Sequence, residues 1–246
     1  MRIQIFFMMI GMTFFLMAEP ILANNDKTAD GLKEALNVGI KAAVKSAGAV
    51  DGYFKNPDIK ILLPEKLQKA DKMIRSFGGG AISDTLVLKM NRAAEKAAPE
   101  AQDIFIKAIK GMQINDAMEI LSSKNAAATK YLQGSSGDAL KNSFYPIVKE
   151  SLGEVNALKV YDEYLGKLKV GDMGKALSLL NATGLTNSGP LAIIGDIELD
   201  MNKYVTDKAI NGLFTILAAE EEKIRKNPEA QVTTLLKDVF GGILSK

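Results

Sequence analysis

Four polar residues could act together in one site although the sequence separates them: Asn91, Arg92, Glu95 and Glu220. Arg92 precedes Glu95 by three positions, so the two charged side chains are within reach of each other on a helix. Glu220 falls within an otherwise apolar helical stripe, where a carboxylate is costly unless it is paired. We therefore predict that Glu220 meets Arg92 or Asn91 where two helices pack together.

This group of four residues has two interpretations, and the sequence leaves both open. In the first, the side chains line a polar pocket that binds a ligand. In the second, they form a buried ion pair and amide that fix the register of two long helices, which is a structural use of such groups. Neither interpretation assigns a catalytic residue.

A second set of acidic residues, Asp196, Glu198 and Asp200, has the alternating spacing of a calcium-binding loop. The glycine expected at the sixth position of such a loop is replaced by Met201, and the glutamate expected at the twelfth is Asp207. The acids are better interpreted as the N-terminal turn of a helix, where negative charge is favourable. We predict no metal site and no cofactor, with these three acids as the weak alternative.

The chain contains no histidine and no cysteine. It therefore cannot build a Ser-His-Asp or Cys-His unit, a thiolate nucleophile, or a zinc site of His and Cys ligands. Hydrolysis by carboxylates alone would need two acids about 5–9 Å apart, and no spacing in the sequence argues for such a pair. We expect a protein without catalytic activity, and a carboxylate-dependent hydrolase is the alternative.

The apolar residues recur with helical spacing almost throughout, so the sequence predicts an all-α protein. We expect a compact bundle of about ten helices and at most one very short extended pair, around Ile59 and Ile61. The main helices are expected at residues 31–46, 64–77, 83–97, 99–111, 115–121, 126–132, from Ser135 through Val148, at 155–168 and 198–226, and from Pro228 onward, with a short piece at 175–180.

Three features of that pattern have specific consequences. Ser135, followed three positions later by Asp138, has the spacing of a capping box and predicts a helix start. Pro146 should kink or divide that helix. The final helix begins at Pro228 and carries apolar residues at helical spacing: Val232, Leu235, Leu236, Val239 and Phe240.

The first residues have the features of a secretory signal peptide. Arg2 precedes an apolar run of about 15 residues, which is shorter than the roughly 20 needed to span a membrane. We place cleavage after Ala23, with Ala18 as the alternative, and an uncleaved anchor is the rival interpretation. Residues 1–23 would then be the signal and residues 24–246 a single helical domain, with a loop or lid from Gly166 to Pro190. The protein is expected in the periplasm, without an integral membrane span after cleavage.

The formal net charge of +2 is too balanced to predict binding to nucleic acid. Methionines on the apolar stripes could line a cavity for an apolar or lipid-like ligand, because methionine packs adaptably, and ordinary core is the alternative. We expect an exported protein that binds an envelope protein or an apolar ligand. A purely structural envelope protein is a further alternative.

Several strings in the sequence resemble a known bacterial family of exported helical proteins, the domain of unknown function 4197. They are GLKEAL (31–36), LPEKLQKA (63–70), MNRAAEKAAPEA (90–101), DA (116–117), AAATKYL (126–132), FYPIV (144–148) and YVTDKAINGLFTILAAEEEKIRKNP (204–228). The resemblance covers nearly all of the chain after the signal. It implies one all-α unit in the envelope of Gram-negative-type bacteria, and it implies no particular activity.

Overall fold

The computed structural model describes residues 19–76, 80–123, 126–154, 159–160, 163 and 200–226, and it confirms an all-α fold without strands in this part of the chain. The elements are α1 (Glu19–Gly48), α2 (Glu65–Ser76), α3 (Gly80–Ala97), the 3-10 helix η1 (Ala98–Glu100), α4 (Ala101–Gly111), α5 (Ile114–Ser122), α6 (Ala127–Glu154) and α9 (Met201–Lys226). The expected number of about ten helices is not confirmed, because the helices predicted at residues 155–168 and from Pro228 fall largely or wholly outside the described residues.

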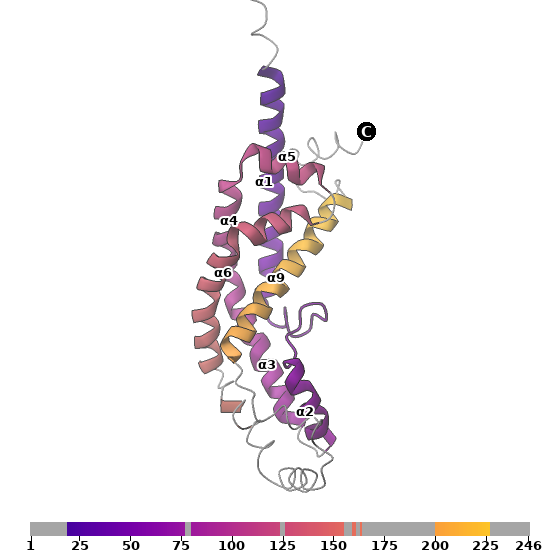
Figure 1. Ribbon diagram of the computed structural model, residues 1–246, viewed down its shortest axis with the longest axis vertical. Coiled ribbons are helices and arrows are strands. Elements are labelled where there is room, and N and C mark those ends of the chain that lie inside the picture. Colours follow the sequence, from indigo (N-terminus) through magenta and orange to yellow (C-terminus); the bar gives the residue numbers. More distant parts are fainter. Residues whose placement is uncertain are drawn as a thin grey trace, which may run out of the picture.

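Helix α9 runs diagonally through the bundle and packs against α6, α1 and α3 (Figure 1). Helix α6 also covers α3 and α4, while α1 contacts α4, α5 and η1. One end of α1 projects beyond the other helices, and α2 packs on α3 toward the opposite end (Figure 1). The long helices thus enclose one continuous core.

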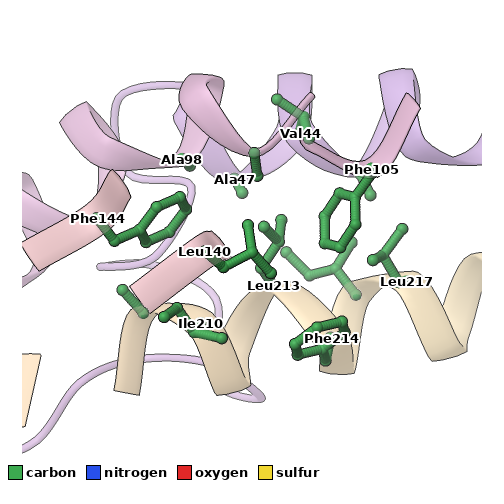
Figure 2. Close-up of a cluster of buried hydrophobic side chains, with 14 of the residues drawn as sticks. Val44, Ala47, Ala98, Phe105, Leu140, Phe144, Ile210, Leu213, Phe214 and Leu217 are labelled. Atoms are coloured by element: carbon green, nitrogen blue, oxygen red, sulfur yellow. The ribbon is translucent and has the colours of Figure 1, made fainter. Parts of the chain in front are cut away.

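The middle of the core is filled by aromatic and aliphatic side chains from several helices (Figure 2). Phe105 of α4 and Phe214 of α9 meet edge to face, with ring centroids 5.6 Å apart. Leu140 and Phe144 of α6 are fully buried in the same cluster. Small residues let the backbones approach closely elsewhere, as where Gly48 lies against the ring of Pro99.

Helix α6 is longer than the sequence predicts, because residues 126–154 do not break at Ser135 or Pro146. The predicted capping box is wrong: the Ser135 hydroxyl donates instead to the backbone oxygen of Tyr131, at 2.8 Å. Every fourth residue of the helix faces the core: Ala128, Leu132, Ser136, Leu140, Phe144, Val148 and Leu152. Burial of this continuous face overrides the local helix-breaking signals.

The predicted signal peptide lies mostly outside the described residues, which begin at Glu19, the first residue of α1. Helix α1 thus includes Ala23 and begins well before Gly31, the predicted start. The predicted loop or lid, from Gly166 to Pro190, also lies outside the described residues. None of the described helices has the length and apolarity that a membrane crossing requires.

Residues 49–64 join α1 to α2 without helix or strand, and we call them the connecting loop. Local turns shape it, for example where the backbone N–H of Lys60 donates to the backbone oxygen of Asn56 at 2.9 Å. Gly52 is needed at its first turn, because a Cβ atom there would lie 2.2 Å from the backbone oxygen of Ser46. Ile59 and Ile61, the extended candidate of the sequence, are both buried in this loop.

Candidate functional site

Glu95 is a buried residue of α3, and its carboxylate binds the connecting loop. One of its oxygens accepts the backbone N–H groups of Tyr53 and Phe54, both at 3.1 Å. Its other oxygen accepts a hydrogen bond from Arg92 at 2.6 Å. These charge-assisted bonds compensate the cost of burying the carboxylate.

Arg92 links Glu95 to the start of the connecting loop. Its second terminal nitrogen lies 2.6 Å from a carboxylate oxygen of Asp51, whose other oxygen lies 2.7 Å from the Lys55 ammonium. Asp51 has a left-handed backbone with φ 68°, a conformation that aspartate tolerates better than most residues. The hydrogen bonds from Lys55 and Arg92 hold the pKa of Asp51 below its usual value.

Asn91 supplies the hydrogen bonds that a neighbouring strand would give to Ile61. Its side-chain oxygen accepts the backbone N–H of Ile61 at 2.9 Å, and its side-chain nitrogen donates to the backbone oxygen of Ile61 at 2.8 Å. The same nitrogen also donates to the backbone oxygen of Val87 at 2.7 Å. The extended residue predicted from the sequence therefore pairs with one fully buried amide instead of a strand.

Helix α9 holds the other side of the connecting loop. The buried Tyr53 hydroxyl donates to the backbone oxygen of Ala209 at 2.6 Å, and burial raises the pKa of this phenol. The Tyr204 hydroxyl donates to the backbone oxygen of Leu62 at 2.8 Å. Gly212 makes the close approach possible, because a Cβ atom there would lie 2.8 Å from a ring carbon of Tyr53.

The outer side of the connecting loop exposes apolar side chains. Val50 is 80% exposed and Leu62 is 51% exposed, the two highest values among the large apolar residues of the described chain. Between them in the sequence is Phe54, which is half-buried. The centroid of its ring is 4.2 Å from the Lys60 ammonium and 5.8 Å from the Arg92 guanidinium. The loop therefore presents apolar side chains among charged ones on a fixed backbone.

Glu220 does not have the neighbours that the sequence predicts. Its carboxylate pairs with Lys223 on the same helix at 2.6 Å, and the long-range partner of Arg92 is Asp51. The structure thus brings Asn91, Arg92 and Glu95 together around the connecting loop and places Glu220 elsewhere. The stripe prediction failed because Glu221, four positions after the buried Leu217, is the carboxylate that faces the core, and Glu220 lies at the edge of the buried face.

Glu221 is the buried carboxylate of α9, and it caps the start of α6. It accepts the backbone N–H groups of Ala128 at 3.2 Å and Thr129 at 2.9 Å, and also the Thr129 hydroxyl at 2.9 Å. Burial raises the pKa of Glu221, but the hydrogen bonds from Thr129, Arg225 and Ala128 outweigh it, so the pKa lies below its usual value. The carboxylate also suits the positive end of the α6 dipole.

Arg225 completes this second network at the end of α5. It bonds to Glu221 at 2.9 Å and donates to the backbone oxygens of Ile120 at 3.0 Å and Ser123 at 3.2 Å. A cation is favourable at a helix C-terminus and an anion at an N-terminus, so the pair joins α5 to α6. The four-residue spacing of Glu221 and Arg225 is the sequence signal that would have indicated the pair.

Of the three weak metal candidates, only Asp200 lies among the described residues. Its carboxylate accepts the backbone N–H of Lys203 at 3.0 Å and so caps the first turn of α9. Asp196 and Glu198 lie outside the described residues, and no cluster of three acidic residues that could hold a metal occurs within those residues.

Hollows occur in the described part of the chain, and two of them bear on the candidate site. The first, about 20 Å³ in volume, is apolar and lies between α1, α6 and α9. The second, about 420 Å³, lies between α5 and the start of α6. Its lining residues are Asp116, Glu119, Ile120, Ser123, Ala127, Lys130 and Tyr131.

Comparison of the sequence with protein families places the chain in a known group. The family described as "Protein of unknown function (DUF4197)" matches residues 23–241 of the 246 in the chain. The chain belongs to the DUF4197 family. Neither a curated protein nor a solved structure matches the DUF4197 chain.

Two of the strings that carry the DUF4197 resemblance contain several of the residues that form the two networks. Residues 90–101 include the three polar residues of α3 that bind the connecting loop. Residues 204–228 include the Tyr204, Gly212, Glu221 and Arg225 contacts. The DUF4197 strings therefore converge on the connecting loop and on the α5–α6 junction.

Proposed function

We propose that the protein is an exported, non-catalytic binding protein that recognises a partner protein in the periplasm through the connecting loop. The observation that carries this proposal is the fixation of the loop by buried polar groups of both α3 and α9 beneath exposed Val50 and Leu62. Compact loops packed by their own side chains are frequently functional.

A fixed loop lowers the cost of binding. Association loses free energy when loops and side chains become ordered at an interface, and a preorganised surface avoids part of that loss. Glu95, Asn91 and Tyr53 have already ordered this backbone through hydrogen bonds. The exposed Val50 and Leu62 can then contribute apolar burial without reorganisation of the loop.

A protein partner fits the geometry better than an apolar small ligand. The apolar hollow of about 20 Å³ is large enough for about one water molecule. Ligand pockets usually measure roughly 300–1,000 Å³ and are mostly apolar. The larger hollow has the size but is lined by Asp116, Glu119 and Lys130.

The carboxylates of the loop network are poorly suited to hydrolysis. Both oxygens of Glu95 accept structural hydrogen bonds, and Arg92 lies between Glu95 and Asp51. A general acid needs a raised pKa, whereas the pKa of Asp51 is lowered by Lys55 and Arg92. This arrangement supports a binding role over the alternative of a carboxylate-dependent hydrolase.

Export is supported by the sequence before residue 24. A basic residue, an apolar run and a small residue at the end precede the polar stretch at Asn24, and the DUF4197 match begins at residue 23. The test is mass spectrometry of the intact protein released from the periplasm of its own host. The measured mass is expected to be that of a chain that starts after Ala23 or Ala18. A full-length mass in the membrane fraction would contradict export as a cleaved protein.

The partner proposal is tested by photo-crosslinking from single positions in the native host. A photoreactive residue at Val50 or Leu62 should give the same crosslinked protein. Ile114 of α5, which is 42% exposed, is the matched control and should not give that product. The captured protein is then purified, and calorimetry compares its binding to the unmodified chain and to Val50→Asp.

The expected result is loss of binding by Val50→Asp with an unchanged melting temperature, because the side chain is exposed. Equal crosslinking from Ile114, or unchanged affinity of Val50→Asp, would contradict binding through the connecting loop. Absence of any crosslinked protein at all three positions would favour the purely structural envelope role.

A further inference from the structure

The hollow between α5 and the start of α6 lies next to the end of α9. Arg225, the penultimate residue of α9, donates to the backbone oxygens of Ile120 and Ser123, and both of these residues line the hollow. Its volume of about 420 Å³ is that of a ligand pocket. The chain therefore leaves α9 at the rim of this hollow.

Part of the lining of the hollow is apolar. Ile120, Ala127 and Tyr131 supply this part, and Ala127 and Tyr131 are only partly buried although they pack against the core. Burial and Asp116 raise the pKa of Tyr131, so its hydroxyl remains a neutral hydrogen-bond donor at physiological pH. An amphipathic segment with an apolar stripe matches this combination of apolar floor and polar rim.

The sequence that follows α9 has such a stripe. Twenty residues, 227–246, follow Lys226, and they lie outside the described residues. Pro228 is placed to start a helix. Five apolar residues after it follow the i, i+3, i+4, i+7, i+8 spacing of an amphipathic helix: Val232, Leu235, Leu236, Val239 and Phe240.

A short helix of this kind needs a surface on which to bury its apolar stripe. Isolated helices of fewer than about 12–15 residues are marginal in water, and their stability comes from packing. Residue 228 must lie within about 7 Å of residue 226, because two residues span no more than that. Connections this short keep consecutive helices adjacent in space. The hollow beside Arg225 is a described surface within reach of that start.

We infer that the hollow between α5 and α6 is the seat of the C-terminal segment that begins at Pro228, with its apolar stripe packed over Ile120, Ala127 and Tyr131. The DUF4197 match extends to residue 241 and so includes the whole stripe. The inference does not depend on the proposed partner binding, which uses the connecting loop. In this arrangement Glu221 and Arg225 hold both the α5–α6 junction and the start of the C-terminal segment.

The absence of cysteine in the chain allows a direct test by disulfide trapping. The full-length chain carries Ala127→Cys together with a second cysteine at Leu235, Leu236 or Val239. The matched controls place the second cysteine at Thr234 or Asp238, which lie on the opposite side of the expected helix. Products are separated on non-reducing gels after mild oxidation, and their masses are measured.

The expected result is an intramolecular disulfide from at least one stripe position and loss of this product in the two controls. Equal yields from stripe and control positions would overturn the inference, and so would the absence of any disulfide. Disulfides formed only between two chains would show that the hollow receives a second copy. These outcomes are independent of the photo-crosslinking experiment, which probes Val50 and Leu62.

A second measurement uses a chain that ends at Asn227. Hydrogen exchange of the amides of α5 and of the first turns of α6 should become faster when the segment is removed, because these groups lose their cover. Exchange in the middle of α3 serves as the internal control and should not change. Unchanged exchange around Ile120 and Tyr131 would contradict the inference.

Discussion

Glu95 and Tyr53 lie 42 positions apart in the sequence, yet a carboxylate oxygen of Glu95 accepts the backbone N–H of Tyr53 at 3.1 Å. The same oxygen accepts the N–H of Phe54, and the second oxygen binds Arg92. A side chain of α3 thereby satisfies backbone groups of a segment that has no secondary structure of its own. This carboxylate holds the first part of the connecting loop, and Asn91 and α9 hold the rest.

Replacement of Glu95 by alanine should therefore destabilise the protein strongly. The change leaves the N–H groups of Tyr53 and Phe54 without their acceptor, at a cost of about 1–3 kcal/mol for each unpaired buried group, while Arg92 keeps only its pair with Asp51. Urea denaturation measures the free energy of unfolding. Glu220→Ala is the control and should change it by less than about 0.5 kcal/mol, because Glu220 forms only a surface pair with Lys223. Similar losses of unfolding free energy in both variants would contradict the assignment of Glu95 as the carboxylate that holds the connecting loop.

Replacement of Asn91 by alanine should loosen the far end of the connecting loop. The backbone N–H and C=O groups of Ile61 would lose their partners, at a cost of about 1–3 kcal/mol for each unpaired buried group. The exchange rate of the Ile61 amide should rise together with the loss of stability. Asn211→Ala, at an exposed position of α9, is the control for amide removal and should leave both quantities nearly unchanged.

Replacement of Gly212 by alanine should force α9 away from the connecting loop. The added Cβ atom would lie 2.8 Å from Tyr53 and 3.1 Å from Ile59, and overpacking of this kind costs about 1–3 kcal/mol. Gly137→Ala is the control: nothing lies within 4 Å of its Cβ position on α6, so it should stabilise the protein by about 0.5–1 kcal/mol.

A double-mutant cycle with Tyr53→Leu identifies the cause of that effect. If the Tyr53 ring is the obstacle, Gly212→Ala should cost less in the Tyr53→Leu background than in the natural chain. Additive losses in the cycle would show that contact with Ile59, or a backbone effect, is responsible instead.

The sequence predicts the helices well because their apolar spacing is a local property. It also groups Asn91, Arg92 and Glu95, since residues one turn apart on a helix must lie together. It does not predict their partners, because Asp51, Tyr53 and Ile61 reach α3 through the tertiary packing of an irregular loop. No local pattern specifies which backbone groups a buried side chain will satisfy.

The wrong predictions for Ser135 and for Glu220 have the same origin. Ser135 is a local signal for a helix start and Pro146 for a kink or a break, but packing of residues four apart keeps α6 continuous across both. The apolar stripe of α9 indicates that Glu220 faces a neighbouring helix, but several helices pack against α9 and the buried carboxylate is that of Glu221. Tertiary contacts, and not the stripe itself, decide which carboxylate is buried.

Stability should fall in acid because of Glu221. Its pKa in the folded protein lies below the value of about 4.5 for an unperturbed glutamate, since the hydrogen bonds from Thr129, Arg225 and Ala128 outweigh burial. Such a group binds protons more readily in the unfolded chain, so its stabilisation is present above about pH 4.5 and is lost as the pH falls through the folded-state pKa.

The measurement is the free energy of unfolding from pH 7 to pH 3 for the natural chain, Glu221→Gln and Glu222→Gln. Glu221→Gln should be less stable at neutral pH and should approach the natural chain in acid, because protonated glutamate and glutamine are then similar. Glu222 pairs with Lys226 only at the surface, so Glu222→Gln should follow the curve of the natural chain closely. A constant difference between Glu221→Gln and the natural chain at every pH would mean that Glu221 contributes by packing, and that its charge does not hold the start of α6.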